Sequence, residues 1–418
     1  MKVVKINGNK TLSGTIKISG SKNSVVALIP ASILTEETVR IESVPNISDT
    51  NNLIDILKFL GSEISYDNEI LNIKNTSIVN KTIPEELAKK LRASYYFMGA
   101  LLARFKKVQM YFPGGCNIGS RPIDLHLKGF KKMGAKITCD NDLYIIEAEE
   151  LIGSNIYLDF ASVGATINLM LAATLAKGIT TIENAAEEPE IVNIALLLNN
   201  MGAKIIGAGT NKIRIIGVEK LHSGIVEVIP DRIEAGTYLI AGALLGDNLK
   251  IENIIPKHID SLLSKFNEIG IKYECNNNSI TICKQSSMLP TKIKTQVYPG
   301  FPTDLAQPMT VLFTKCNGNS LIEETIYENR MGHIPFLNKM GAKIKATTQT
   351  ATVMGPCEFH GEMVTSTDLR AGASLLIAGL LAKGKTTILD AEHILRGYEN
   401  IEDKLKSVGA DIVVSEIE

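Results

Sequence analysis

The sequence predicts an α+β protein of two lobes, each an inside-out α/β barrel with helices packed inside and sheets outside. Three observations lead to this fold class: the length of the chain, a repeated glycine signature, and helices that are apolar on nearly every side. At 418 residues, of which 45% are hydrophobic and 21% charged, the chain exceeds the length that one core usually serves. Two domains are therefore expected.

A signature of helix, glycine and strand recurs six times along the chain. Its glycines are 73, 68, 68, 71 and 68 residues apart, which indicates six copies of one repeat. Each glycine fits the C-terminus of a helix, where a positive φ favours glycine. The six are Gly61, Gly134, Gly202, Gly270, Gly341 and Gly409.

An apolar helical stretch and a short strand precede each signature. Residues 162–176 followed by a strand at 180–183, and residues 367–382 followed by a strand at 386–389, show this order. The repeat is therefore predicted as strand, buried helix, strand, amphipathic helix, strand, strand. A helix that is apolar nearly all round, such as 371–382, must be enclosed by other elements. Six repeats divide naturally into two lobes of three, each near the usual domain size.

The starts of the buried helices are candidate anion sites. If the repeats are related by rotation, the buried helices of one lobe run parallel and present their N-termini at one end. Helix N-termini carry unpaired N–H groups and about half a positive charge each. Lys22, Arg92, Arg232 and Arg370 stand at four of the six starts, although the net charge of the chain is only -1. An ordinary capping or solvated role is the alternative for each of them.

Charge, chain start and ligand spacing exclude several classes of protein. With 44 Lys plus Arg against 45 Asp plus Glu, no global field would recruit nucleic acid or an anionic membrane. The sequence shows no apolar signal region at its start and no apolar run near the ~20 residues that span a bilayer, so we expect a cytoplasmic protein. The six cysteines lack a C-x-x-C pair and the six histidines lack ligand spacing, which predicts reduced thiols and no structural metal.

Residues 379–386 match the phosphate-loop pattern G-x-x-x-x-G-K-T. That chemistry requires a strand, then the loop, then a helix, whereas the order predicted here is helix, turn, strand. We therefore reject the pattern as a nucleotide site. The Gly207-Ala208-Gly209 fragment is predicted to be a hairpin turn.

The most informative stretch is residues 111–127, between a strand and a helix of the second repeat. Three glycines and two prolines allow its loop several shapes, and long loops of this kind tend to be functional. Cys116 lies there close to Arg121, so we expect a reactive thiol, with a structural cysteine as the alternative. His126 lies one turn into the following helix and is expected to pack or orient rather than to act as a base.

A second stretch, residues 298–308, places Asp304 at a helix start in the other lobe. Two roles are open for Asp304: capping that helix, or acting as a general base among cationic neighbours. Because Asn caps almost as well as Asp, the capping role predicts that Asp304→Asn leaves stability unchanged. Arg330 and Arg396 lie in loops that correspond by repeat to the Cys116 loop, with a solvated role as the alternative.

Taken together, these residues resemble the UDP-N-acetylglucosamine enolpyruvyl transferases, the bacterial enzymes that open peptidoglycan synthesis, over essentially the whole chain. The shared motifs are residues 20–23 (GSKN), 92–94 (RAS), 113–124 (PGGCNIGSRPID), 162–166 (SVGAT), 302–304 (PTD), 328–330 (ENR) and 368–370 (DLR). The resemblance implies transfer of the enolpyruvyl group of phosphoenolpyruvate to the 3-hydroxyl of UDP-N-acetylglucosamine, with release of phosphate and without a metal or organic cofactor. EPSP synthases share the architecture and the donor but lack the Pro-Gly-Gly-Cys loop. A non-catalytic nucleotide-sugar sensor would need neither Cys116 nor Asp304.

The resemblance also implies roles for individual residues and leaves the oligomeric state open. Cys116 would donate a proton to the methylene carbon of phosphoenolpyruvate, and Asp304 would take the proton of the hydroxyl. The residues expected around phosphoenolpyruvate are Lys22, Arg121, Arg330, Arg370 and Arg396, of which Lys22 and Arg396 are also expected to be catalytic. Asp368 is a further expected substrate-binding residue. Those expected around the UDP-sugar are Asn23, Arg92, Arg121, Pro122, Ile123, Asp124, Leu125, Ser162, Val163, Gly164, Asp304 and Ile326. The lobes implied are residues 22–229 and residues 1–21 with 230–418.

Overall fold

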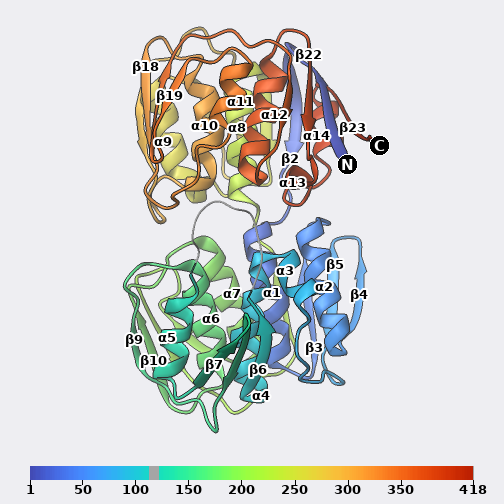
Figure 1. Ribbon diagram of the computed structural model, residues 1–418, viewed down its shortest axis with the longest axis vertical. Helices are drawn as coiled ribbons and strands as arrows, with labels where there is room; N and C mark the ends of the chain where they lie inside the picture. Colours follow the sequence, from blue (N-terminus) through green and yellow to red (C-terminus); the bar gives the residue numbers. More distant parts are fainter. Residues whose placement is uncertain (113–121, 418) are drawn as a thin grey trace. The chain divides into compact units, whose positions relative to one another are not determined.

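The third repeat shows the predicted order of elements in full. In the computed structural model, which describes residues 1–112 and 122–417, this repeat runs β9 (Asn155–Tyr157), α6 (Val163–Thr174), β10 (Ile179–Glu183), α7 (Pro189–Asn200), β11 (Lys204–Ile206) and β12 (Lys212–Ile216) (Figure 1). Strand β10 pairs parallel to β9 and antiparallel to β12, which in turn pairs antiparallel to β11. The buried helix therefore connects two parallel neighbours, and the second helix leads to a hairpin. Gly207 and Gly209 lie in that hairpin with φ of 86° and 84°, as predicted.

The described chain divides into a central unit, residues 20–112 and 122–229, and a terminal unit, residues 1–19 and 230–417. Besides β9 to β12 with α6 and α7, the central unit contains α1 (Lys22–Ala31), η1 (Ser32–Leu34), β3 (Thr38–Glu42), α2 (Ser48–Leu60), β4 (Glu63–Asp67), β5 (Ile70–Lys74), α3 (Glu85–Lys90), η2 (Arg92–Tyr95), α4 (Tyr96–Phe105), β6 (Lys107–Tyr111), α5 (Asp124–Lys132), β7 (Lys136–Asp140), β8 (Leu143–Glu147) and β13 (Gly224–Glu227).

The terminal unit is built from both ends of the chain. Its elements are β1 (Lys2–Asn7), β2 (Leu12–Lys17), α8 (Arg232–Leu245), β14 (Gly246–Glu252), η3 (Pro256–Ile259), α9 (Asp260–Ile269), β15 (Tyr273–Cys275), β16 (Ser279–Ile282), β17 (Lys292–Lys294), α10 (Thr303–Phe313), β18 (Asn319–Glu323), α11 (Ile334–Lys339), β19 (Ile344–Ala346), β20 (Thr350–Met354), β21 (Met363–Thr365), α12 (Leu369–Leu381), β22 (Lys385–Leu389), α13 (Glu392–Leu395), α14 (Ile401–Ser407) and β23 (Asp411–Glu416).

In two repeats, the strand that precedes the buried helix in the chain pairs with a strand of the other repeat. Strand β2 pairs parallel to β14, although α1 follows β2 in the chain, and β13 pairs parallel to β3, although α8 follows β13. Strand β1 lies between β22 and β23, so the N-terminal strand completes the last repeat. Along the residues that the structure describes, the chain passes from one unit to the other after Ser19 and after Ile229.

The second repeat departs from the predicted pattern. Its sheet, in the part of the chain that the structure describes, holds β6, β8 and β7, and the expected first strand is only a single bridge between Ile83 and Met110. Pro84 follows Ile83 directly and is the N-cap residue of α3. Because proline lacks an N–H and favours the start of a helix, it ends the strand after one pair.

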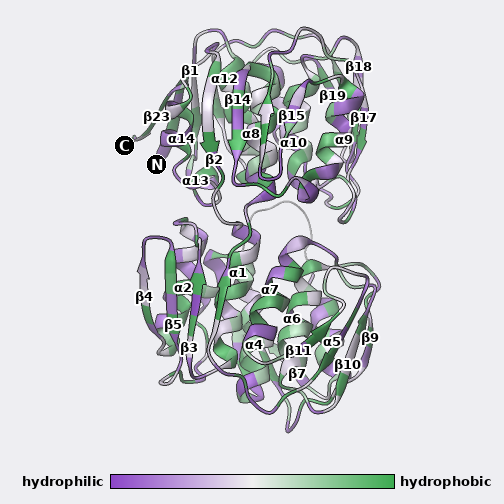
Figure 2. Ribbon diagram, turned by 180° about the vertical axis from the view of Figure 1, so that it is seen from behind, coloured by the Kyte–Doolittle hydropathy of each residue, from purple (hydrophilic) through white to green (hydrophobic). Residues whose placement is uncertain are grey.

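The predicted buried helices are enclosed, as expected. Residues 164–174 of α6 and residues 369–380 of α12 are all buried. Helix α4 contacts α1 and α6 in the central unit, and α10 contacts α8 and α12 in the terminal unit (Figure 1). The strands around them alternate in burial, as in β10, where buried Thr180 and Ile182 separate more exposed residues. Hydrophobic and hydrophilic residues both occur along the helices and strands of each unit (Figure 2).

The glycine prediction is confirmed at all six positions. The φ angles at these glycines lie between 85° at Gly270 and 114° at Gly341, each next to a helix end. The phosphate-loop pattern is also rejected by the structure, because residues 379–381 end α12 and β22 begins at Lys385, with no helix after the turn. None of the described helices is long and apolar enough to cross a membrane.

Candidate functional site

A cluster of ion pairs joins the starts of α10 and α12 in the terminal unit. Asp304, in the first turn of α10, accepts a hydrogen bond on Oδ1 from Nη2 of Arg330 at 2.7 Å and on Oδ2 from Nη2 of Arg370 at 3.0 Å. The arginine side chains are only 4% and 5% exposed, whereas that of Asp304 is 24% exposed. Asp304 is therefore the member of the cluster that a ligand can reach most easily.

The capping role considered for Asp304 is wrong. The N-cap residue of α10 is Pro302, and no side chain makes the cap hydrogen bond there. Asp304 instead lies inside the first turn, where a negative charge is favoured by the helix dipole and where both carboxylate oxygens serve the arginines. Because Asp304 does not cap α10, Asn at this position is expected to cost stability, contrary to the prediction from capping.

Arg370 connects three helix starts. Asp368 caps α12 by accepting hydrogen bonds from the backbone N–H groups of Arg370 and Ala371 at 2.9 and 3.1 Å. The Arg370 guanidinium also donates to the hydroxyl of Tyr398 at 3.2 Å. Burial opposes the charge of Arg370, but Asp304, Tyr398 and Asp231 raise its pKa above the ordinary value. Because Asp231 is the N-cap residue of α8, the starts of α8, α10 and α12 meet around this guanidinium.

Arg330 is held from several sides. Its guanidinium lies 4.9 Å from the ring centre of Tyr327, and Nη1 lies 3.8 Å from Oδ1 of Asp368. Its backbone oxygen accepts a hydrogen bond from Nε2 of Gln307 at 2.9 Å. Ile326 lies half-buried four residues earlier on the same segment. The structure thus brings four predicted site residues of this unit together: Asp304, Arg330, Asp368 and Arg370.

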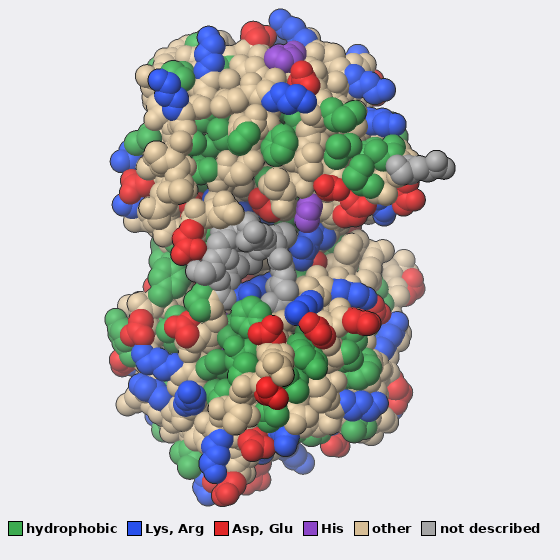
Figure 3. Space-filling view, viewed as in Figure 1, with side chains coloured by type: hydrophobic (Ala, Val, Ile, Leu, Met, Phe, Trp, Pro, Cys, Tyr) green, Lys and Arg blue, Asp and Glu red, His purple; other side chains and the backbone are tan. Residues whose placement is uncertain are grey.

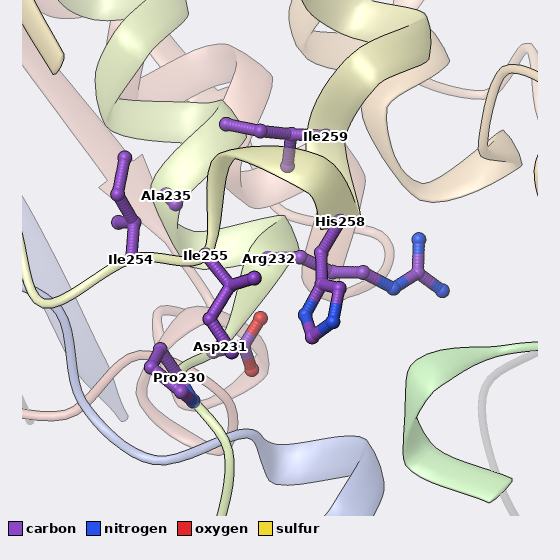
Figure 4. Close-up of a pocket in the computed structure, with 8 residues that line it drawn as sticks. All are labelled: Pro230, Asp231, Arg232, Ala235, Ile254, Ile255, His258 and Ile259. Atoms are coloured by element: carbon purple, nitrogen blue, oxygen red, sulfur yellow. The ribbon is translucent and has the colours of Figure 1, made fainter. Parts of the chain in front are cut away.

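Arg396 is the C-cap residue of α13, which contacts α12, and its side chain is half-buried. Beside the start of α8, a depression lined by Asp231, Arg232 and His258 is too narrow to admit a water molecule (Figure 4). The Arg232 guanidinium extends away from Asp231 and lies 5.4 Å from the ring centre of Tyr298. The cation at this helix start therefore packs on an aromatic ring.

Lys22 begins α1 in the central unit and has a buried partner. Its Nζ lies 2.9 Å from Oδ2 of Asp49, and the two side chains are 15% and 2% exposed. Asp49 stands in the first turn of α2. Asn23, next to Lys22, is half-buried, and Ser21 caps α1 by accepting from the N–H of Ser24.

The starts of α4 and α6 meet around an aromatic cluster. The Arg92 guanidinium lies 5.3 Å from the ring centre of Phe112 and 6.0 Å from that of Tyr95. Tyr95 packs edge-on against His126, with ring centres 5.1 Å apart. Burial, followed by the charge of Arg92, lowers the pKa of His126 to about 3, so the ring is neutral, as a packing residue should be. A side chain at Gly164 would lie 2.7 Å from the Tyr95 hydroxyl.

The remaining predicted residues of this unit lie at the starts of α6 and α5. Ser162 caps α6 by accepting from the N–H of Ala165 at 3.3 Å, and half-buried Val163 begins the helix. At α5, Ile123 is the N-cap residue, Asp124 begins the helix, Leu125 is half-buried and Pro122 is exposed. Cys116 and Arg121 lie outside the described residues.

Several members of these clusters were not predicted: Asp49, Asp231, Tyr95 and Tyr398. Each is an ordinary residue type at its position in the sequence, and only the tertiary contact marks it. Positive and negative side chains are interspersed over the visible face of each unit, in keeping with the net charge of -1 (Figure 3). Within residues 1–112 and 122–417, no group of three or more His, Cys, Asp or Glu could hold a metal ion.

Comparisons with known proteins agree on one family. A family model described as EPSP synthase (3-phosphoshikimate 1-carboxyvinyltransferase) matches residues 6–405. UDP-N-acetylglucosamine 1-carboxyvinyltransferase 2 of Listeria monocytogenes is 52% identical over 410 residues, covering 98% of this chain and 97% of that protein. The protein of the same name from Bacillus subtilis is 51% identical over 413 residues, covering 99% and 96%.

Solved structures agree as well. The enolpyruvyl transferase NikO from Streptomyces tendae matches with a TM-score of 0.90 and 26% identity, covering 99% of both chains. EPSP synthase from Acinetobacter baumannii matches with a TM-score of 0.77 and 18% identity, covering 100% of both chains. The second likeness shows the fold alone.

Proposed function

The chain belongs to the EPSP synthase family, and we propose that it transfers the enolpyruvyl group of phosphoenolpyruvate to the 3-hydroxyl of UDP-N-acetylglucosamine, releasing phosphate. The observation that carries this choice of acceptor is the 52% identity, over 98% of the chain, with a UDP-N-acetylglucosamine 1-carboxyvinyltransferase. The EPSP synthase that shares the fold is only 18% identical. The reaction would be an early, cytoplasmic step of bacterial peptidoglycan synthesis and would involve neither nucleic acid nor a membrane.

We also infer that each unit is an inside-out barrel of three repeats. Supporting this, the parallel pairing of β9 with β10 recurs for β2 with β14, β13 with β3, β17 with β18 and β21 with β22. Each of these pairs precedes or follows one of the buried helices. Three repeats arranged in this way would bring three helix starts together in each unit, and the site residues would lie there.

The ion pairs of Asp304 support a role as proton acceptor. Two guanidinium partners keep a carboxylate ionised, which is the form that accepts a proton. Phosphoenolpyruvate is an anion and would compete for the same guanidinium groups. Binding of the donor would therefore rearrange the ion pairs of Asp304 and leave a carboxylate oxygen free to accept the proton of the acceptor hydroxyl.

The proposed reaction then balances in two steps. The 3-hydroxyl gives its proton to Asp304, its oxygen bonds to C2 of phosphoenolpyruvate, and the methylene carbon takes a proton, for which Cys116 is the proposed donor. The tetrahedral intermediate next loses phosphate, which takes up the proton held by Asp304, and a methyl proton, which returns to Cys116 and restores the double bond. Lys22, Arg121 and Arg396 would neutralise the phosphate, because fixed cations stabilise developing negative charge more effectively than mobile water.

Residues of the central unit would hold the UDP-sugar. These are Asn23, Arg92, Pro122, Ile123, Asp124, Leu125, Ser162, Val163 and Gly164, with Arg121. This assignment is supported by the helix starts that carry Arg92 and Gly164, which both lie next to Tyr95. The N–H groups at helix N-termini are suited to bind a diphosphate.

The test is phosphate release from phosphoenolpyruvate with either UDP-N-acetylglucosamine or shikimate-3-phosphate as acceptor. We expect phosphate only with the UDP-sugar, and none without an acceptor. Equal or greater release with shikimate-3-phosphate would reject the proposed acceptor while leaving the family intact.

A further inference from the structure

Glu324 is a buried carboxylate just after β18 that receives four hydrogen bonds. It is 1% exposed. Its Oε1 accepts from the Thr295 hydroxyl at 2.9 Å and from the backbone N–H groups of Ile326 and Tyr327 at 2.8 and 3.1 Å. Its Oε2 accepts from the Thr303 hydroxyl at 2.8 Å. All four donors are neutral groups, so hydrogen bonding rather than ion pairing satisfies this carboxylate.

One oxygen of Glu324 holds the start of α10. Thr303 is the first residue of that helix and precedes Asp304 directly. Because Pro302 supplies no cap hydrogen bond, the bond from Thr303 to Glu324 fixes the entry of the chain into the helix. The position of the Asp304 carboxylate depends on that entry.

The other oxygen holds the segment that carries Arg330. The N–H groups of Ile326 and Tyr327 begin this segment, and the Tyr327 ring lies 4.9 Å from the Arg330 guanidinium. The two oxygens of one side chain therefore fix the two halves of the Asp304–Arg330 ion pair, which is 2.7 Å long.

We propose that Glu324 is a positioning residue for the reaction, setting the distance and orientation of Asp304 relative to Arg330. The expected effect of Glu324 on turnover rests on the proposed function, whereas its expected effect on the Asp304–Arg330 ion pair does not. Glu324 itself is not proposed to contact substrate. Its action passes through Thr303 on one side and through the Ile326–Tyr327 peptide groups on the other.

The variants Thr303→Val and Thr303→Ser isolate one of these links. Val keeps the branched shape but removes the donor to Glu324, whereas Ser keeps the hydroxyl. We expect Thr303→Val to lower kcat by about 10- to 100-fold, the size of effect that a small misplacement of a catalytic group produces. The KM for the UDP-sugar should change little, because the bonds to Ile326 and Tyr327 remain. Thr303→Ser should keep kcat within about threefold of the parent value.

Glu324→Gln distinguishes positioning from charge. Its amide oxygen can accept the three bonds now made to Oε1, and its amide N–H can donate to the Thr303 hydroxyl, which also accepts. Positioning therefore predicts that Glu324→Gln keeps most of the parent kcat, while Glu324→Ala loses it. Thr386→Val is a matched control, because Thr386 is fully buried and its hydroxyl makes no hydrogen bond within the described residues.

Crystal structures of the Thr303 variants provide a readout without turnover. We expect the distance from Arg330 Nη2 to Asp304 Oδ1 to exceed 3.5 Å in Thr303→Val and to stay near the parent 2.7 Å in Thr303→Ser. An unchanged ion pair in Thr303→Val would overturn the inference, whether or not the protein is an enolpyruvyl transferase. Equal loss of kcat in Glu324→Gln and Glu324→Ala, or a lower melting temperature with normal kcat in Thr303→Val, would overturn it too.

Discussion

Replacing Asp304 by Asn should destabilise the terminal unit, because this carboxylate is the shared partner of two buried guanidinium groups. Arg330 and Arg370 are 4% and 5% exposed and approach Asp304 at 2.7 and 3.0 Å. An Asn side chain offers one neutral acceptor in place of two charged ones. Whichever arginine the amide oxygen binds, the amide N–H groups would face the N–H groups of the second arginine.

The size of the loss follows from these contacts. Hydrogen bonds to charged groups contribute about 1.5 to 3 kcal/mol each, and removing one member of a buried pair costs about 3 to 5 kcal/mol. Asp304 is 24% exposed, and Asp368 remains 3.8 Å from Arg330, so part of the charge stays balanced. We therefore expect Asp304→Asn to lower the free energy of unfolding by about 2 to 4 kcal/mol, which is on the order of 10 °C in melting temperature.

The assay is thermal unfolding without substrates, with Asp260→Asn as the matched control. Asp260 is the first residue of α9 and pairs with a single exposed lysine, Lys257. Because both members of that pair are exposed to solvent, its loss should leave the melting temperature close to the parent value. If Asp304→Asn melted together with this control, the ion-pair argument would be refuted. In the folded variant, turnover should fall by about 100- to 10,000-fold, the usual contribution of a positioned base, while calorimetry should still detect binding of the UDP-sugar.

Three further predictions use other sites. Burial lowers the pKa of His333 to about 4. Between about pH 6.5 and pH 4 only the unfolded chain binds this proton, so the free energy of unfolding falls on acidification. In His333→Gln the midpoint of urea unfolding should therefore depend less on pH across that range. Gly164→Ala should destabilise by about 1 to 3 kcal/mol, although Ala usually favours a helix, because its methyl group would lie 2.7 Å from the Tyr95 hydroxyl; equal melting temperatures would contradict this. Burial raises the pKa of the Cys316 thiol to about 11, so mass spectrometry after brief alkylation should find label on exposed Cys139 and Cys275 and none on Cys316.

The repeat was predictable from sequence because its signature depends on the backbone conformation of single residues. A positive φ at a helix end selects glycine without any help from distant residues, and all six predicted glycines adopt such an angle. Enclosure of α12 was predictable for a similar reason, since an apolar helix can be stable only inside. The short first strand of the second repeat was not predicted, because a single residue, Pro84, ends it and the repeat pattern does not depend on that residue.

The candidate site was predictable only in part. Motifs identified Asp304, Arg330 and Arg370, but not the partners that hold them. Glu324 lies 29 residues from Thr295 and 21 from Thr303 in the sequence, so nothing local marks it as the acceptor for both. Asp49 stands in the first turn of a helix, where an acidic residue is ordinary.

The structure also changes the electrostatic argument made from sequence. Cations at helix starts suggested open anion sites, but Lys22 is paired with Asp49, and Arg370 with Asp304, which also binds Arg330. The positive end of a helix favours any carboxylate, and here the protein's own aspartates take that place. An anionic substrate would therefore exchange partners with these aspartates rather than enter a vacant positive field. Such an exchange couples arrival of the donor to release of Asp304, the residue that the proposed reaction needs as a base.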